Sequence, residues 1–179
     1  MYNLVLIILK NFYIHNFACW AAARAVQNPH LNGTGTEKIR KALDDIDIYS
    51  HVEDSTKLID YSNAHKVIVK QLLMKLNWNE CVYKYGVASK IIAIYFKVSI
   101  IIPNNEPWSL MEKIYPPIDS YNISKIKGFE KFKWTKLDES TFYKMITSLE
   151  KQLEMEKSNF IEFESQNIFC PNFDKKLQV

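Results

Sequence analysis

The chain has 179 residues, of which 47% are hydrophobic and 13% aromatic, so it is long enough for one domain with a sizeable buried core. Only 4 glycines and 6 prolines are present, which disfavours an all-β protein with many tight turns, and the apolar content excludes a disordered chain. The net charge of +3 permits nucleic-acid binding but does not require it.

The cysteines, the histidines and the apolar runs indicate in which cellular compartment the protein works and whether it binds a cofactor. Cys19, Cys81 and Cys170 lie far apart in the sequence, which is typical of a reducing compartment rather than of a disulfide framework. The four histidines are scattered, without a C-x-x-C or H-E-x-x-H pattern, so we predict no metal site and no cofactor. The run Leu4 to Leu9 is too short to span a membrane, and no basic residue precedes it as in a signal peptide. We therefore expect a cytoplasmic protein without a membrane partner.

The first predicted helix is rich in alanine. The run Leu4 to Leu9 either forms an opening strand or, as we prefer, begins a helix. The segment from Phe17 to Gln27 is strongly helix-prone, and its small residues allow close helix packing with Phe17 and Trp20 as anchors. Asn28-Pro29 ends this element, and a polar loop follows.

Two amphipathic helices follow. Thr34 and Glu37 have the spacing of a capping box ahead of a helix, and its apolar residues fall at i, i+3, i+4 and i+7: Ile39, Ala42, Leu43 and Ile46. A further helix is predicted from about Ser62 to Leu76. Its expected inner side consists of Ala64, Val67, Ile68, Leu72 and Leu76.

The next predicted helix is apolar on nearly every side, which is typical of the buried centre of a domain. Gly86 comes just before it, and Lys90 and Lys97 interrupt it on nearly the same side. A glycine before a helix is usually a turn, and a lysine near a helix start usually extends to water. A plain core element and an anion site with a reactive amine are both consistent with this pattern.

The C-terminal part predicts shorter elements and one long helix. A short helix is expected at Trp108 to Ile114, and Asp119 occupies the N-cap position of a brief helix that Gly128 would end. Asp138 then caps a long helix with an apolar stripe of Phe142, Met145, Ile146, Leu149 and Leu153. The aromatic tail from Phe160 to Phe173 is expected to pack back on the body.

Charge is unevenly distributed in this part of the chain. Five lysines lie between Lys125 and Lys136 among Phe129, Phe132 and Trp134, whereas the stretch from Glu150 to Glu164 is acidic. This asymmetry predicts a basic and an acidic side. In all, the sequence predicts an all-α, compact multi-helix domain spanning residues 1–179, with its core at about 12–155 and a tail at 156–179.

Three pieces, in this order, resemble the helix-hairpin-helix DNA glycosylases of the endonuclease III-like superfamily. Phe17 to Gln27 resembles the early helix that ends in a polar residue inserted into the duplex. Gly86-Val87-Ala88-Ser89-Lys90 is similar to the G-V-G-x-K hairpin and the start of the following helix. Pro117-Ile118-Asp119 is similar to the segment that holds the catalytic aspartate at a helix start. The match spans roughly residues 17–128, although each motif is short.

The resemblance implies two helical lobes around a cleft and a set of site residues. Lys90 would be the amine nucleophile and Asp119 would stabilise the sugar cation, while Gln27 would fill the gap left by the extruded base. The remaining residues would contact the DNA backbone: Gly86, Val87 and Ala88 through their amides, and Lys84, Lys97, Lys125, Lys127, Lys131 and Lys133 through their side chains.

The chain departs from the family pattern in three respects. Ala88 replaces the second hairpin glycine, which weakens the expected phosphate contact. Lys90 and Asp119 are 29 positions apart, so an insertion near residues 104–112 has to be looped out. The cysteine quartet that binds an iron–sulfur cluster in some relatives is missing.

The resemblance predicts a base-excision enzyme whose partner is duplex DNA with a damaged or modified base. Asp119 is equally consistent with a plain helix cap, Gln27 with a surface residue, and the lysine-rich segment with a solvated face. Two other functions stay open, a non-catalytic nucleic-acid-binding module and a helical protein-interaction partner. Several aromatic residues could stack on a base: Trp20, Tyr85, Tyr95, Trp108, Tyr121 and Trp134.

Overall fold

Helices make up the regular structure in the part of the chain that the computed structural model describes, which comprises residues 2–26, 35–48, 60–78, 84–103 and 111–166. No β-strand occurs among these residues. The all-α prediction is therefore confirmed for the described part of the chain.

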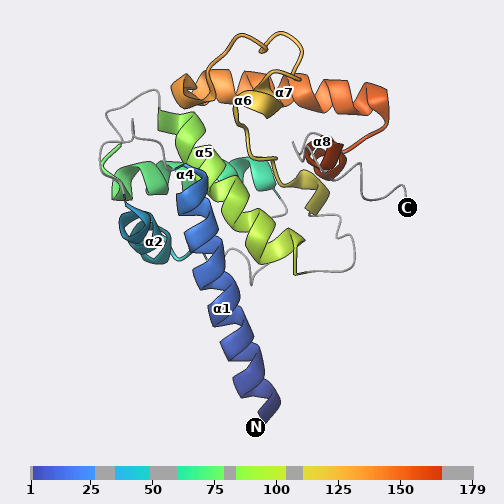
Figure 1. Cartoon of the computed structure of the whole chain (residues 1–179). Helices are drawn as coiled ribbons and strands as arrows, with labels where there is room; N and C mark the ends of the chain where they lie inside the picture. Colours follow the sequence, from blue (N-terminus) through green and yellow to red (C-terminus); the bar gives the residue numbers. More distant parts are fainter. Residues whose placement is uncertain (1, 27–34, 49–59, 79–83, 104–110, 167–179) are drawn as a thin grey trace, which may run out of the picture.

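The fold is arranged around α5 (Tyr85–Phe96), which runs through the middle of the molecule (Figure 1). Helices α1 (Tyr2–Ala25) and α4 (Tyr61–Lys75) pack against α5, and α2 (Thr36–Asp45) packs against α1. The long helix α7 (Glu139–Glu156) crosses one end of α5, next to the short helix α6 (Ser120–Ile123). Helix α8 (Phe160–Gln166) lies against the 3-10 turn at Met111–Lys113.

The burial of α5 follows from its sequence. Ile91, Ile92, Tyr95 and Phe96 are fully buried, and burying each such side chain contributes roughly 1.5–3 kcal/mol relative to leaving it exposed. The helix continues into a π-helical segment, Lys97–Ile101. The prediction of a buried central helix is confirmed.

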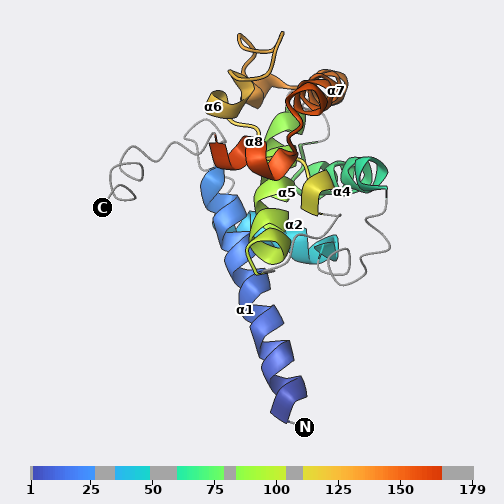
Figure 2. The same ribbon diagram turned by 90° about the vertical axis from the view of Figure 1, so that its right-hand side faces the viewer.

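Helix α1 differs from the expectation in two ways. The apolar run Leu4 to Leu9 belongs to this single helix rather than to a strand, and the N-terminal half of α1 extends away from the rest of the fold (Figures 1 and 2). The expected anchors Phe17 and Trp20 are 57% and 51% exposed, so that prediction is wrong. The small residues Ala18, Cys19, Ala22 and Ala23 form the buried face, and this leaves the two rings on the solvent side. Among the described helices, none is long and apolar enough to cross a membrane.

The predicted inner faces of α2 and α4 are mostly correct. All four apolar residues expected to be buried around α2 are buried. In α4 the buried stripe follows Tyr61, His65, Ile68 and Leu72, one side chain per turn, which leaves Val67 51% exposed, contrary to expectation. The expected cap Thr34 lies outside the described residues, and Gly35 is the N-cap of α2.

In the C-terminal part, both predicted aspartate caps are confirmed, because Asp119 and Asp138 accept hydrogen bonds from backbone amides at the starts of α6 and α7. Gly128 does not end α6, whose C-cap is Ser124; it adopts a positive φ of 86° in a later turn. The apolar stripe of α7 is buried as predicted. Phe160 and the following turn of α8 pack back on the core, which confirms the prediction for the described part of the tail.

Candidate functional site

The amine and the carboxylate that the sequence analysis expects to act together lie side by side. Lys90 Nζ is 3.8 Å from Asp119 Oδ2, although the first residue belongs to α5 and the second to the start of α6. The Lys90 side chain is only 11% exposed, whereas that of Asp119 is 38% exposed. The Lys90 amine is therefore mostly buried, and the Asp119 carboxylate is partly exposed to solvent.

The Asp119 carboxylate is fixed by the backbone that follows it. Its Oδ1 atom accepts hydrogen bonds from the amides of Tyr121 (3.0 Å) and Asn122 (2.9 Å), which leaves Oδ2 directed at Lys90. The buried Asn122 side chain in turn donates a 2.7 Å hydrogen bond to the carbonyl of Pro117. Two functions thus share one side chain, because the same carboxylate caps α6 and faces the amine.

The environment of Lys90 combines burial, which shifts the amine toward its neutral form, with two neighbours that favour its cation, Asp119 and Trp134. The Lys90 Nζ atom lies 4.6 Å from the centroid of the Trp134 ring, on the 3-10 turn Trp134–Lys136. Burial lowers the pKa of Lys90, and the attraction of the Asp119 carboxylate opposes this shift in part. A lysine with a lowered pKa presents its lone pair more often at neutral pH, as an amine nucleophile requires. Trp134 is one of the six aromatic residues named above as possible stacking partners for a base, and its contact with Lys90 places it at the candidate site.

Gly86 has a different role from the one expected. It lies in the first turn of α5 rather than before it, and its amide donates to the Leu137 carbonyl at 3.1 Å. A Cβ atom at this position would stand 2.2 Å from the carbonyl oxygen of Trp134. The glycine therefore lets the Trp134–Leu137 segment approach α5 closely, which brings Trp134 to the Lys90 amine.

The expected phosphate cradle is corrected accordingly. Because the Gly86 amide is already bonded within the chain, it is not available to a phosphate. Val87 and Ala88 are fully buried in the core. These three residues pack the helix against its neighbours, and any phosphate contact has to come from the lysine side chains instead.

The lysine-rich segment adjoins the Lys90–Asp119 pair through Trp134. Its side chains Lys125, Lys127, Lys131 and Lys133 are exposed, while Phe129 and Trp134 pack against the core. The backbone of this segment is held by α7. Gln152 accepts a hydrogen bond from the amide of Lys127 and donates one to the carbonyl of Lys125, and Ser148 donates to the Lys127 carbonyl. These four lysines form a rim whose backbone is anchored at Lys125 and Lys127, and Trp134 links the segment to Lys90.

The other three expected contact residues lie in different settings. Lys84 is the N-cap of α5, with its Nζ 5.1 Å from the Trp78 ring centroid. Lys97 forms an ion pair with Glu164 of α8, so a phosphate would have to displace that carboxylate. Gln27 lies outside the described residues.

A separate hollow of about 340 Å³ lies between the start of α4, the end of the 111–113 turn, and helices α7 and α8. It shares no lining residue with the pair and is rich in carboxylates, so it suits a phosphate poorly. Its lining residues are Asp60, Tyr61, Ser62, Glu112, Lys113, Tyr115, Glu150 and Phe160.

Comparisons with protein-family models, with curated proteins and with solved structures found no match to this chain.

Proposed function

We propose that this protein is a base-excision enzyme of the DNA glycosylase type, which acts on a damaged or modified base in duplex DNA. One observation carries the proposal: the buried Lys90 amine lies 3.8 Å from the solvent-facing Asp119 carboxylate, next to Trp134 and a rim of exposed lysines. Lys90 and Asp119 come from two of the three pieces that carry the resemblance, and Trp134 comes from the lysine-rich segment.

The amine is suited to covalent chemistry on a sugar. In its neutral form, Lys90 Nζ would attack C1′ of the extruded nucleotide and form a C–N bond. The N-glycosidic bond breaks, the base leaves with the bonding electron pair and takes up a proton, and the amine loses a proton. Ring opening of the sugar then gives a Schiff base between Lys90 and C1′.

The Asp119 carboxylate is suited to the charge that develops in this reaction. As the glycosidic bond breaks, positive charge accumulates on the sugar, and a fixed carboxylate nearby lowers the energy of that state. Capping by two amides holds the carboxylate in place without help from the substrate. In a purely hydrolytic version of the reaction, the same group would orient the attacking water.

The lysine rim supplies the expected DNA contact. Exposed lysines neutralise phosphates and release counterions, which gives affinity that falls with salt. Extruding a base costs a few kcal/mol, and contacts with the flanking backbone help to offset this cost.

Borohydride trapping on duplexes with modified bases or an abasic site tests the proposal. Borohydride reduces a Schiff base to a stable amine, so we expect a covalent protein–DNA adduct in the wild type and none in Lys90→Ala. Lys75→Ala is the control, because it removes an amine that forms an exposed ion pair with Asp45 and is not among the expected DNA contacts. A protein that neither forms the adduct nor releases a base from any of these duplexes would contradict the proposal.

A second candidate function, a protein-interaction partner, is favoured by the exposed aromatic residues of α1. Phe12, Tyr13, Phe17 and Trp20 are all more than half exposed, and the rings of the last two are stacked. Exposed aromatic clusters of this kind are typical of protein interfaces. Nucleic-acid binding that is weak and insensitive to salt would favour this function over base excision.

A further inference from the structure

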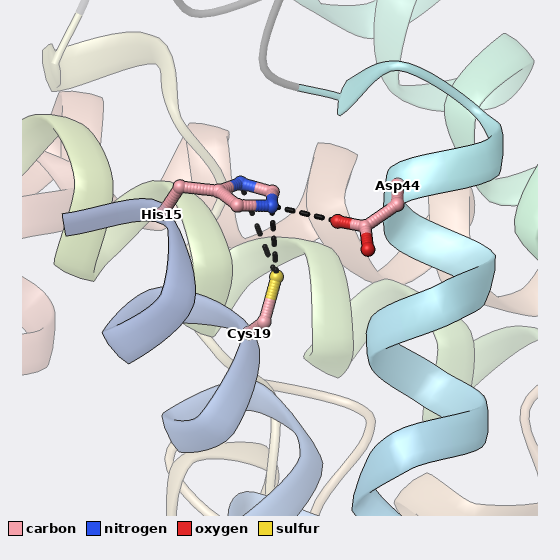
Figure 3. A group of neighbouring side chains, drawn as sticks. All are labelled: His15, Cys19 and Asp44. Atoms are coloured by element: carbon pink, nitrogen blue, oxygen red, sulfur yellow. Dashed lines mark hydrogen bonds and ion pairs between the residues drawn. The ribbon is translucent and has the colours of Figure 1, made fainter. Parts of the chain in front are cut away.

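A second cluster of reactive side chains lies where α1 meets α2, independent of the chemistry proposed at Lys90. Figure 3 shows Cys19 of α1 and Asp44 of α2 both directed toward the His15 ring of α1, with the sulfur joined by dashed lines to both ring nitrogens. His15 Nε2 is 2.7 Å from Asp44 Oδ1 and 3.7 Å from Cys19 Sγ. One ligand atom from each residue lies within 4.8 Å of the others.

The helices themselves account for this convergence. His15 and Cys19 are one turn apart on α1 and therefore face the same side, as do the paired metal ligands of an H-x-x-x-H motif. Asp44 is in the last turn of α2, which packs against α1. Arg40, one turn earlier, lies 3.8 Å from Asp44 Oδ2, which leaves Oδ1 to face the imidazole.

The imidazole is oriented by a third helix. His15 Nδ1 lies 2.8 Å from the hydroxyl of Tyr95, a fully buried residue of α5. In the tautomer with the proton on Nδ1, this nitrogen donates to the hydroxyl and the lone pair of Nε2 points at Asp44. Cys19 Sγ lies beside the ring, 3.7 Å from Nε2 and 4.0 Å from Nδ1. Metal-binding histidines are commonly oriented in this way, by a hydrogen bond from the nitrogen that does not bind the metal. Without a metal, a proton on Nε2 has to fill the space between the imidazole and the carboxylate.

We propose that His15 Nε2, Cys19 Sγ and Asp44 Oδ1 bind one Zn²⁺ ion, which links α1 to α2. Nitrogen, sulfur and carboxylate oxygen together form a ligand set that suits zinc, with a fourth, tetrahedral position left to water. This inference departs from the sequence analysis, which predicts no metal site.

One edge of the cluster has nearly the length expected for a tetrahedral site, whereas the Cys19 side chain has to change rotamer to bring its sulfur in front of Nε2. With Zn–N near 2.0 Å and Zn–S near 2.3 Å, the N···S edge of the tetrahedron is about 3.5 Å, compared with the 3.7 Å between His15 Nε2 and Cys19 Sγ. The N···O edge would be about 3.3 Å, so the Asp44 carboxylate has to withdraw slightly. Its side chain is 43% exposed, which allows this movement and provides an entry path for the ion.

The cluster is not arranged as a cysteine nucleophile with its base. A triad requires the thiol and the carboxylate on opposite nitrogens of the ring. Here Asp44 is at Nε2 and the Tyr95 hydroxyl is at Nδ1, while Cys19 Sγ lies between the two nitrogens at 3.7 and 4.0 Å. Burial of Cys19 disfavours a free thiolate, so a metal would have to displace the thiol proton. Zinc would replace that proton: the Zn–S bond forms, the S–H bond breaks, and one proton is released to solvent.

Cobalt titration of the full chain tests the proposal, because Co²⁺ bound to a thiolate in a tetrahedral site gives intense ligand-to-metal and visible bands. The protein is stripped with a chelator and carries Cys81→Ser and Cys170→Ser, so that Cys19 is the only thiol. We expect the thiolate band in this background and its loss on adding Cys19→Ser. A band that survives Cys19→Ser, or no Co²⁺ binding at micromolar concentrations, would overturn the proposal.

Zinc affinity provides a second measurement that does not depend on a buried substitution. Asp44→Asn should weaken Zn²⁺ binding at least tenfold and reduce the rise in melting temperature that zinc causes. The matched control is Asp45→Asn, which changes the adjacent exposed carboxylate, paired with Lys75 at 3.6 Å, and should alter Zn²⁺ affinity less than twofold. Equal affinities in the two variants would overturn the proposal.

Discussion

The two lysines of the central helix occupy matching positions but different environments. Lys90 and Lys97 lie on nearly the same side of the helix, and each forms an ion pair with a carboxylate from a later part of the chain. Lys97 contacts Glu164 directly, and that carboxylate is only 13% exposed. Lys90 stands 3.8 Å from Asp119, whose carboxylate is 38% exposed and already bonded to two amides.

This difference separates a structural ion pair from a candidate reactive one. Lys97 is the charged partner of Glu164. This ion pair ties α8 to the π-helical segment Lys97–Ile101 that follows α5. Asp119 keeps its cap bonds whether or not the amine is present. The Lys90 amine can move away from Asp119 without unfolding a helix, so it is free to react. The Lys97 amine is not, because its ion pair with Glu164 holds α8 in place.

The largest expected effect comes from neutralising the Asp119 carboxylate. Asp119→Asn should slow base release about 100-fold or more, because a fixed charge near the sugar cation is lost. The unfolding free energy should change by less than about 0.5 kcal/mol, since asparagine is an equally good N-cap. Glu164→Gln is the control and should leave base release within about twofold. Single-turnover base release and urea unfolding measure both quantities, and equal losses of rate in the two variants would remove the distinction.

The packing at Gly86 offers the next largest effect. In Gly86→Ala the new methyl group would stand 2.2 Å from the Trp134 carbonyl oxygen, so the segment that carries Trp134 has to shift. Despite the better helix propensity of alanine, we expect a loss of about 1–3 kcal/mol in unfolding free energy together with weaker borohydride trapping. Gly35→Ala has no neighbour within 4 Å and serves as the control for trapping, which it should leave unchanged. Unchanged stability in Gly86→Ala would show that the close approach is not required.

The ion pair at the other end of α5 should influence stability and not chemistry. Lys97→Ala leaves the mostly buried Glu164 without this partner, and we expect a loss of about 1 kcal/mol in unfolding free energy. Because the pair ties down α8, limited proteolysis should cut near Phe160–Gln166 sooner than in the wild type. If Lys97→Ala instead abolished trapping at normal stability, the roles assigned to the two lysines would be reversed.

The pH dependence of trapping gives a finer test of the Lys90 environment. Burial lowers the pKa of Lys90 and Asp119 raises it, so Asp119→Asn should lower the pKa further. Because only the neutral amine attacks, the trapping rate on a preformed abasic duplex should begin to rise at a lower pH in Asp119→Asn. A profile displaced to higher pH would mean that the carboxylate acts on another group.

The smallest expected effect concerns single lysines of the rim. Lys131→Ala should reduce the slope of log affinity against log salt by about 0.9, the value for one phosphate contact on duplex DNA. Lys97→Ala should leave the slope unchanged, because its amine is paired with Glu164. Fluorescence anisotropy at several salt concentrations measures both slopes. An equal change of slope in the two variants would mean that the DNA also contacts Lys97, at the opposite end of α5.

The sequence predicts most of the helices and one contact between distant residues, that of Lys90 with Asp119. The apolar stripe of α7 and the aspartate caps are local patterns, and the structure follows them. Which face of α1 is buried depends on its neighbours, so the aromatic anchors were assigned to the wrong side. Gly86 was assigned to a phosphate because its true partner, the Trp134 carbonyl, lies 48 positions away in the chain.

The His15–Cys19–Asp44 cluster shows the same limit. The spacing of His15 and Cys19 by one helical turn is visible in the sequence, but a single such pair is a weak signal. Asp44 joins them only through the packing of α2 on α1. Possible metal ligands spaced four residues apart within a predicted helix are the signal that singles out His15 and Cys19.

The capping of α6 has one more consequence. Since the Asp119 carboxylate is positioned by the amides of Tyr121 and Asn122, the amine and the carboxylate are mounted on separate supports, α5 and the start of α6. A change in the charge of Lys90 therefore leaves the carboxylate where it is. A molecule that enters between the two groups meets an anion whose orientation does not have to be rebuilt at each encounter.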